Sequence, residues 1–307
     1  MKKVLVTGSN GLLGQKLTDI YKNVKDIELI ATGRGPDRYP QKNGYVYDQM
    51  DITNEDEVMK TILKHAPDCV IHTAAMTNVD ACELDKEGCV AQNIDAVNFV
   101  VKAANTVNAH LVHLSTDFIF DGTAGPYTEQ GVPNPLSFYG DSKLKGEEII
   151  MHSSKKWAIL RTVLVYGLVA DMSRSNIVLW ARDALKNQKA IKVVDDQFRT
   201  PTLAEDLAMG CRLAEMHNAQ GVFNISGKDY MSIYDLVERV STYFGYNMDM
   251  VERVSSDTLQ QPAKRPPVTG FIIDKAIKEM GYQPHSFEEG IKLVQEQYDK
   301  FTHTQAT

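Results

Sequence analysis

The chain opens with a short apolar segment that leads directly into three regularly spaced glycines. Val4–Thr7 is predicted to be a buried strand, and Gly8, Gly11 and Gly14 follow it as a helical run begins near Leu12. This spacing permits a tight turn, a close approach of backbone to a pyrophosphate and close packing of helix on strand. A helix that begins there offers free N–H groups and its positive dipole end to phosphate. The segment therefore predicts a dinucleotide-binding turn, and the alternative is a plain glycine turn in an α/β protein.

Strand-like and helix-like segments then alternate along the first half of the chain. Further strands are predicted over 28–31, 45–47, 69–72, 111–114 and 158–161, and helices over 12–22, 55–65, 86–105 and 140–152. This order is typical of an α/β fold with a Rossmann-type doubly wound parallel sheet. After about Val165 the pattern changes, with helices predicted over 175–186 and from Pro201. We expect a dinucleotide-binding domain over residues 1–167, with returning segments at about 190–225, and a smaller C-terminal α/β lobe mainly over residues 168–307.

Tyr139 and Lys143 lie four residues apart, at and just after the start of a predicted helix, and on a helix their side chains share one face. A free phenol has a pKa of about 10 and exchanges protons poorly at neutral pH, and a neighbouring ammonium lowers that pKa. Acid–base catalysis works best when the pKa lies near the working pH. Thr116, upstream, could hydrogen-bond the oxygen that gains or loses the proton. The pair alone indicates little, but together with the glycine turn it indicates catalysis.

The composition excludes several classes of protein. Of 307 residues, 43% are hydrophobic and 24% charged, which is ordinary for a globular protein, and the net charge of −7 argues against a broad nucleic-acid surface. No apolar run is long enough to span a membrane and no signal-peptide pattern is present, so we expect a cytoplasmic protein without a membrane partner. His72 is expected to be a core imidazole. No zinc spacing or other metal site is indicated by the cysteines, which we expect to be reduced: Cys69, Cys82, Cys89 and Cys211.

Several motifs together resemble a known family. The three glycines with Thr116, Tyr139 and Lys143 resemble the extended branch of the short-chain dehydrogenase/reductases. Within that branch the dTDP-4-dehydrorhamnose reductases are similar from Val4 to about Tyr298, in segments 74–80, 114–122, 127–129, 133–136, 139–143, 196–202 and 265–266. The resemblance implies a substrate-binding lobe in the second part of the chain. It also implies NADPH-dependent reduction of a nucleotide-linked 4-keto-6-deoxysugar, most simply dTDP-4-dehydrorhamnose to dTDP-rhamnose for cell-surface polysaccharide.

The same resemblance implies roles for individual residues. Tyr139 would give a proton to the incipient alkoxide, Lys143 would lower the phenol's pKa and bind the nicotinamide ribose, and Thr116 would donate a hydrogen bond to the carbonyl or to Tyr139. The implied cofactor-binding positions are Gly8, Asn10, Gly11, Leu12, Leu13, Gly14, Arg34, Asp51, Ile52, Ala74, Ala75, Met76, Ser115, Tyr139 and Lys143. The implied substrate-binding positions are Thr77, Val79, Thr116, Asp117, Leu164, Gln197, Arg199 and Arg265.

The second predicted strand carries information about the cofactor. Its tip has no carboxylate for a ribose 2′-hydroxyl, and Arg34 is placed to pair with a 2′-phosphate through its planar fork. NADPH is therefore favoured over NADH, and the alternative is that Arg34 is a solvated loop charge. Asp51 contacts the adenine, as the resemblance implies, or belongs to the N-terminal cap region of the next helix, and both can hold.

Other positions and the class of protein leave alternatives open. Asp117 either lies near the substrate or caps its loop, and Arg199 either binds a diphosphate or is a surface charge. Leu164 stands where the family commonly has tryptophan, which leaves the identity of the sugar open. The regulatory β subunit of methionine adenosyltransferase shares this fold and would bind a dinucleotide without catalysis, but the complete catalytic set favours an enzyme. A homodimer and a Mg²⁺ ion at a subunit contact are compatible with the sequence but not indicated by it.

Overall fold

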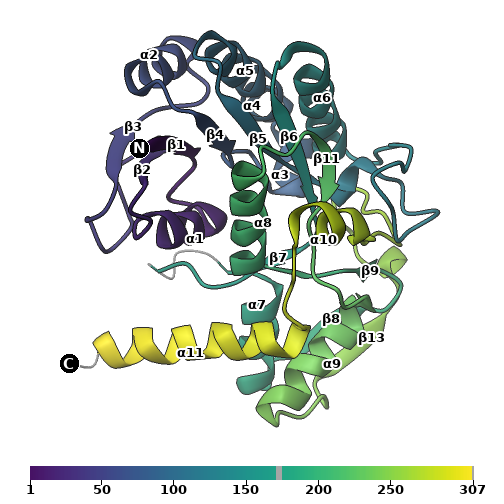
Figure 1. Ribbon diagram of the computed structural model, residues 1–307. Coiled ribbons are helices and arrows are strands. Elements are labelled where there is room, and N and C mark those ends of the chain that lie inside the picture. Colours follow the sequence, from purple (N-terminus) through teal and green to yellow (C-terminus); the bar gives the residue numbers. More distant parts are fainter. Residues whose placement is uncertain (171–174, 306–307) are drawn as a thin grey trace.

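A seven-stranded parallel sheet forms the centre of the computed structural model, which describes residues 1–170 and 175–305 (Figure 1). The order β11-β6-β5-β4-β1-β2-β3 reverses direction at β1, as in a doubly wound fold. The strands are β1 (Lys2–Thr7), β2 (Ile27–Gly33), β3 (Val46–Gln49), β4 (Cys69–His72), β5 (His110–Thr116), β6 (Trp157–Thr162) and β11 (Gly221–Asn224). The α/β, Rossmann-type prediction is confirmed.

Helices bury both faces of this sheet. One face is covered by α1 (Leu12–Tyr21) and α8 (Ala204–Met216), and the other by α2 (Glu55–His65), α5 (Ala96–Thr106) and α6 (Phe138–Ser153) (Figure 1). Successive residues of β6 point to opposite faces of the sheet. Ile159 packs in the core with α2 and α5, and Leu160 packs in the core with α1 and α8. Burial on both faces explains why the central strands read as continuous apolar runs in the sequence.

The helix predicted over residues 86–105 is present, but it is not α-helical throughout. After the separate short helix α3 (Val79–Leu84), it runs without a break through α4 (Lys86–Val90), a π-helical turn η1 (Ala91–Asp95) and α5. Asn93 lies buried in the turn, where its amide accepts a hydrogen bond from the Met76 N–H and donates to the Met76 carbonyl and the Ser142 hydroxyl. Such turns occur often at functional sites, and this one fastens α5 to the loop after β4.

Two predicted helix starts also differ from the structure. Helix α6 begins at Phe138 rather than at residue 140, because the Ser137 side chain caps it by accepting a hydrogen bond from the Gly140 N–H. Tyr139 therefore stands in the first turn of α6. Helix α8 begins at Ala204 rather than at Pro201, because Thr202–Leu203 first forms the short strand β10, which pairs with β7 (Val165–Tyr166).

A second region lies below the sheet in Figure 1, with a core of its own. It contains α7 (Ile177–Lys186), β8 (Ile191–Val194), α9 (Ile233–Phe244), β13 (Val251–Val254) and α11 (Phe287–Gln305). The remaining short elements of the chain are β9 (Phe198–Arg199), β12 (Met231–Ser232), α10 (Asp274–Met280) and the 3₁₀ turns η2 (Asp117–Ile119) and η3 (Ser256–Thr258). Of these, α10 packs in the core of the central sheet and η2 lies against α6. Strand β8 pairs with β13, whereas β11 pairs with β6 in the central sheet. The division of the chain at residue 167 stays a prediction.

Two further properties follow from the described residues. None of their helices combines the length and apolar character needed to cross a membrane. All four cysteines are buried and free.

Candidate active site and dinucleotide cavity

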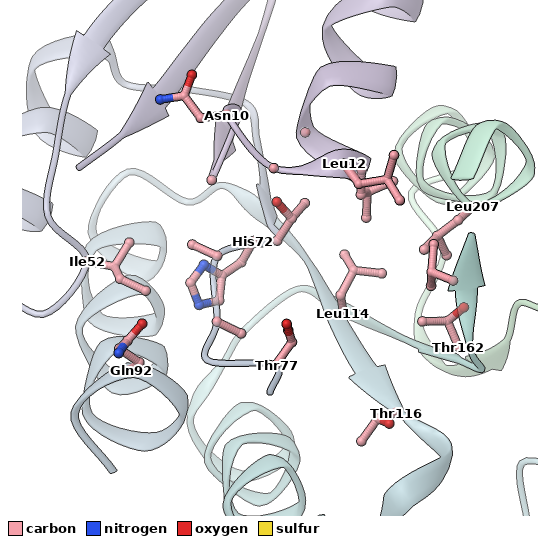
Figure 2. A pocket seen from close by; sticks show the side chains of 18 of the residues that line it. Asn10, Leu12, Ile52, His72, Thr77, Gln92, Leu114, Thr116, Thr162 and Leu207 are labelled. Carbon is pink, nitrogen blue, oxygen red and sulfur yellow. The ribbon is translucent and has the colours of Figure 1, made fainter. Parts of the chain in front are cut away.

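A cavity of about 870 Å³ lies at the carboxyl ends of the central strands. It spans the point where the strand order reverses, between β1 and β4, which is where doubly wound sheets bind their ligands. In Figure 2, Leu12 and Leu207 stand on one side of the cavity and Ile52 and Gln92 on the other, with His72 between them. The cavity is therefore built mainly from the first half of the chain, with α8 closing one side.

The glycine turn between β1 and α1 forms one part of the wall of this cavity. Gly8 has φ +69°, and a Cβ added there would lie 3.0 Å from the Ala74 Cα. A Cβ at Gly14 would overlap the carbonyl oxygen of Gly8, so a side chain would force α1 away from the turn. The N-cap residue that precedes α1, Gly11, provides no side-chain cap. The first N–H groups of α1 are thus left for an anion in the cavity.

Arg34 lies at the far end of the cavity, after β2, and its side chain is exposed. Within the described residues it makes no side-chain hydrogen bond or ion pair, so its guanidinium is available to a ligand. Asp51 lines the same end, and its side chain accepts hydrogen bonds from the Thr53 N–H and hydroxyl. The cap of α2 is Asn54, which accepts from the Glu57 N–H. Asp51 therefore shapes the turn before α2 and is not its cap.

The predicted catalytic residues meet at the opposite end. Helix α6 carries Tyr139 and Lys143 against the end of β5, where Thr116 stands, and all three line the cavity. Tyr139 is 8% exposed and Lys143 only 3%. The Lys143 ammonium donates hydrogen bonds to the Leu114 carbonyl at 2.7 Å and to Nε2 of His113 at 3.3 Å. A buried ammonium thus lies one helical turn from a buried phenol.

The electrostatics correct one prediction. Burial raises the pKa of Tyr139 above its ordinary value; the Thr116 hydroxyl opposes this rise and the Asp117 carboxylate adds to it. The net lowering of the phenol's pKa that was expected beside the Lys143 ammonium is therefore not found, because desolvation by burial is the largest effect and raises this pKa. Burial also lowers the pKa of Lys143 to about 8. Around neutral pH the phenol keeps its proton, which suits a group that donates one.

Asp117 and Arg199 form a buried pair beside this end of the cavity. The Arg199 guanidinium donates to the carbonyls of Phe198, Pro266 and Pro267, and its Nε lies 3.5 Å from Oδ2 of Asp117. Arg199 is only 4% exposed, which contradicts the surface-charge alternative. Arg199 lines the cavity, and these bonds occupy most but not all of its five N–H donors, so the binding of a diphosphate by Arg199 stays a prediction.

Both carboxylate oxygens of Asp117 accept hydrogen bonds from side chains of the protein. Its Oδ2 accepts a hydrogen bond of 2.5 Å from the Thr269 hydroxyl and its Oδ1 accepts from the Thr116 hydroxyl at 3.2 Å. The Thr116 oxygen in turn accepts from the Phe118 N–H. The single proton of Thr116 thus points to Asp117 in this structure. The expected donation from Thr116 to the carbonyl or to Tyr139 stays a prediction.

The remaining predicted substrate residues divide into two groups. Thr77, Val79 and Leu164 line the cavity, and Leu164 has the left-handed φ of +40° that is rare for a leucine. Gln197 and Arg265 do not line it. Arg265 instead forms a two-point ion pair with Asp80, at 2.7 and 3.2 Å.

The predicted cofactor positions line the cavity with one exception. Met76 lies outside the lining, and its backbone holds Asn93. The other positions form the wall: Gly8, Asn10, Gly11, Leu12, Leu13, Gly14, Arg34, Asp51, Ile52, Ala74, Ala75, Ser115, Tyr139 and Lys143.

Sequence reasoning missed many lining residues. Some follow strands at the same sheet edge, so their position after an apolar run was a usable signal: Gly33, Gly35, Pro36, Arg38, Met50, Thr53, His72, Thr73, Leu114, Phe118 and Thr162. Others come from later segments or helices and carried no such signal: Gln92, Val165, Gly167, Val169, Ser175, Asn176 and Leu207. Among the described residues no group of three or more His, Cys, Asp or Glu side chains could hold a metal.

Comparison with known proteins agrees with the fold. The family model of the RmlD substrate binding domain matches residues 1–300. A dTDP-4-dehydrorhamnose reductase of Aggregatibacter actinomycetemcomitans is 29% identical over 306 residues, which cover 96% of this chain and 98% of that protein. Methionine adenosyltransferase 2 subunit beta of Bos taurus is 31% identical over 248 residues, 79% of this chain and 72% of that protein.

A solved structure is similar over nearly the whole chain. It is the dTDP-4-dehydrorhamnose reductase of Bacillus anthracis in complex with NADP, with a TM-score of 0.82 and 27% identity. The match covers 96% of this chain and 99% of that one. The family resemblance read from the motifs is therefore confirmed.

Proposed function

This chain belongs to the RmlD substrate-binding-domain family of the extended short-chain dehydrogenase/reductases, and from that premise we propose that it reduces a nucleotide-linked 4-keto-6-deoxysugar with NADPH. The proposed substrate is dTDP-4-dehydrorhamnose and the product dTDP-rhamnose. The observation that carries the proposal is the meeting of Tyr139, Lys143 and Thr116 at one end of a cavity whose other end holds the glycine turn and Arg34.

The proposed mechanism assigns each end of the cavity a task. The N–H groups at the start of α1 bind the pyrophosphate, and Arg34 pairs with the 2′-phosphate. NADPH supplies the hydride when bound. Lys143 holds the nicotinamide ribose, and Tyr139, kept neutral by burial, donates its proton to the ketone oxygen as that oxygen becomes an alkoxide. Thr116, which lines the same end of the cavity, donates a hydrogen bond to the carbonyl or to Tyr139 in this proposal.

A second candidate function comes from the relative named methionine adenosyltransferase 2 subunit beta. A regulatory subunit would use the same cavity to bind dinucleotide without reducing a ketone. The buried Tyr139–Lys143 pair favours the reductase, because a binding module has no need of a buried phenol and ammonium at the sugar end. The expected homodimer, the cytoplasmic location and any divalent ion remain predictions.

The experiment that tests the proposal is a screen of nucleotide-linked 4-ketosugars for NADPH oxidation, with the product's stereochemistry read by NMR. We expect turnover of dTDP-4-dehydrorhamnose. Turnover of a different ketosugar would keep the reaction and change the substrate. NADPH binding without turnover of any ketosugar would favour the regulatory alternative.

Replacing Arg34 by alanine should remove most of the preference for NADPH over NADH. A charge-assisted hydrogen bond contributes about 1.5–3 kcal/mol, so NADPH affinity should fall about 10- to 100-fold. Affinity for NADH, which has no 2′-phosphate, should change little and serves as the internal control. Titration of nicotinamide fluorescence measures both, and equal losses for the two cofactors would exclude a contact between Arg34 and the 2′-phosphate.

A further inference from the structure

His113 is a buried histidine that the proposed reaction does not use. It lies on β5 directly before Leu114, is 1% exposed, and its Nε2 is 3.3 Å from the Lys143 ammonium. Its ring lies against that of His72, with centroids 5.3 Å apart. His113 thus lies directly against the ammonium, and His72, which lines the cavity, lies against His113.

The hydrogen bonds fix the protonation of both rings. An ammonium only donates, so Nε2 of His113 must accept and its proton must sit on Nδ1. The Thr7 hydroxyl accepts from the N–H groups of Thr73 and Ala74, each at 3.2 Å, and so gives its own proton to Nδ1 of His72 at 2.8 Å. Both imidazoles are therefore neutral.

The surroundings keep these rings neutral. Burial and, to a smaller extent, the Lys143 charge together lower the pKa of His72 to about 3. Burial followed by the charges of Lys143 and His72 holds the pKa of His113 well below its ordinary range. A second positive charge therefore does not form next to Lys143 as the pH falls through the neutral range.

Lys143 meets ionisable groups from several elements. Glu147 lies on the same helix, Cys89 comes from α4 and Cys82 from α3, and these three raise its pKa, whereas burial lowers it. Both carboxylate oxygens of Glu147 accept hydrogen bonds from the Arg161 guanidinium. From the sheet, the groups that touch the ammonium are the Leu114 carbonyl and His113.

We propose that His113 is a positioning residue, which together with the Leu114 carbonyl binds two of the three N–H groups of Lys143 and so directs the third into the cavity. The inference rests on the proposed role of Lys143 in holding the nicotinamide ribose. A neutral acceptor suits this position because it stabilises the ammonium without adding charge. Without it, a buried N–H would lose its partner and the ammonium form would be disfavoured.

The direct test measures the protonation of Lys143 by ¹³C NMR on protein labelled at lysine, with the signal assigned by its loss in Lys143→Met. We expect a midpoint near pH 8 in the parent protein. In His113→Leu the midpoint should fall by about one pH unit, which corresponds to the loss of one buried hydrogen bond. His113→Gln, which can supply an amide oxygen, should restore most of the shift. An unchanged midpoint in His113→Leu would overturn the proposal.

A matched control comes from the same strand. His110 is also buried in β5, but its Nε2 bonds to the Ala219 carbonyl away from the cavity, so His110→Leu should leave the Lys143 midpoint where it was. If His113→Leu does not fold, ¹⁵N NMR of the parent protein still tests the proposal, because it measures the protonation state of His113. We expect His113 to stay neutral, with its proton on Nδ1, throughout the pH range in which an ordinary histidine titrates, and titration near the ordinary histidine pKa of about 6.5 would overturn the proposal.

NADPH titrations separate this inference from the proposed function. His113→Leu should bind NADPH nearly as well as the parent at pH 6 and less well at pH 8, where more of its Lys143 is deprotonated. Failure of the parent protein to bind NADPH at any pH would reject the proposed function, whereas the NMR midpoints would still report on the His113–Lys143 contact. NADPH binding by the parent with the same pH dependence in both proteins would reject the role of His113 alone.

Discussion

Replacing Tyr139 by phenylalanine should slow ketosugar reduction by about 10²- to 10⁴-fold, the usual contribution of a general acid. The hydroxyl is the only group removed, and the ring keeps its edge-to-face contact with Phe118, whose centroid is 5.7 Å away. Because burial raises the pKa of this phenol, the phenol is protonated throughout the neutral pH range. Removing the hydroxyl should therefore slow the reaction at every pH in that range. The rate of NADPH oxidation with the ketosugar found in the screen measures the effect.

A tyrosine elsewhere provides the control for this substitution. Tyr282 is fully buried and donates a hydrogen bond to the Ser226 carbonyl, but it does not line the cavity. Tyr282→Phe should therefore leave the rate near that of the parent, while Tyr139→Phe should still bind NADPH. If Tyr139→Phe reduces the ketosugar at the parent rate, Tyr139 is not the proton donor.

Replacing Arg161 by methionine should lower the free energy of unfolding by about 3–5 kcal/mol, because it leaves a buried carboxylate without its partner. The Arg161 guanidinium donates to both oxygens of Glu147, at 3.0 and 2.7 Å, and the two side chains are 4% and 0% exposed. The pair joins β6 to α6, the helix that carries Tyr139 and Lys143. Denaturant unfolding of the parent and the variant measures the difference.

Two variants show whether burial causes this effect. The exposed pair Lys102–Glu55 has a similar N–O distance of 2.9 Å, and Lys102→Met should cost no more than about 1 kcal/mol. In the double variant Arg161→Met with Glu147→Leu, neither charge remains buried, so most of the lost stability should return. A loss in Arg161→Met no larger than that in Lys102→Met would contradict the argument.

Much of the fold could be predicted because its signals are local. Apolar runs marked the central strands, and the glycine turn and the four-residue spacing of Tyr139 and Lys143 each lie within a few residues of chain. Ser137 was also a usable signal, because a cap residue before a helix moves its start to Phe138. The π-helical turn around Asn93 was not predictable in this way, because the Met76 and Ser142 contacts that accompany it lie 17 and 49 residues away in the sequence.

The roles of charged side chains were the least predictable. Arg199 and Arg265 have equally polar side chains in the sequence, yet one is buried against Pro266 and Asp117 while the other pairs with Asp80 outside the cavity. Their partners come from distant segments, and no local pattern specifies which carboxylate a long side chain will reach.

The sequence by itself determined the doubly wound sheet, the dinucleotide turn and the identity of the phenol and ammonium, because each depends on periodicity or spacing along a short stretch. Only the tertiary structure decided that burial raises the pKa of Tyr139, that the Thr116 proton points to Asp117, and that His113 lies against Lys143. These depend on how much water remains around a group and on which distant donors and acceptors surround it, and both are set when separate elements pack together.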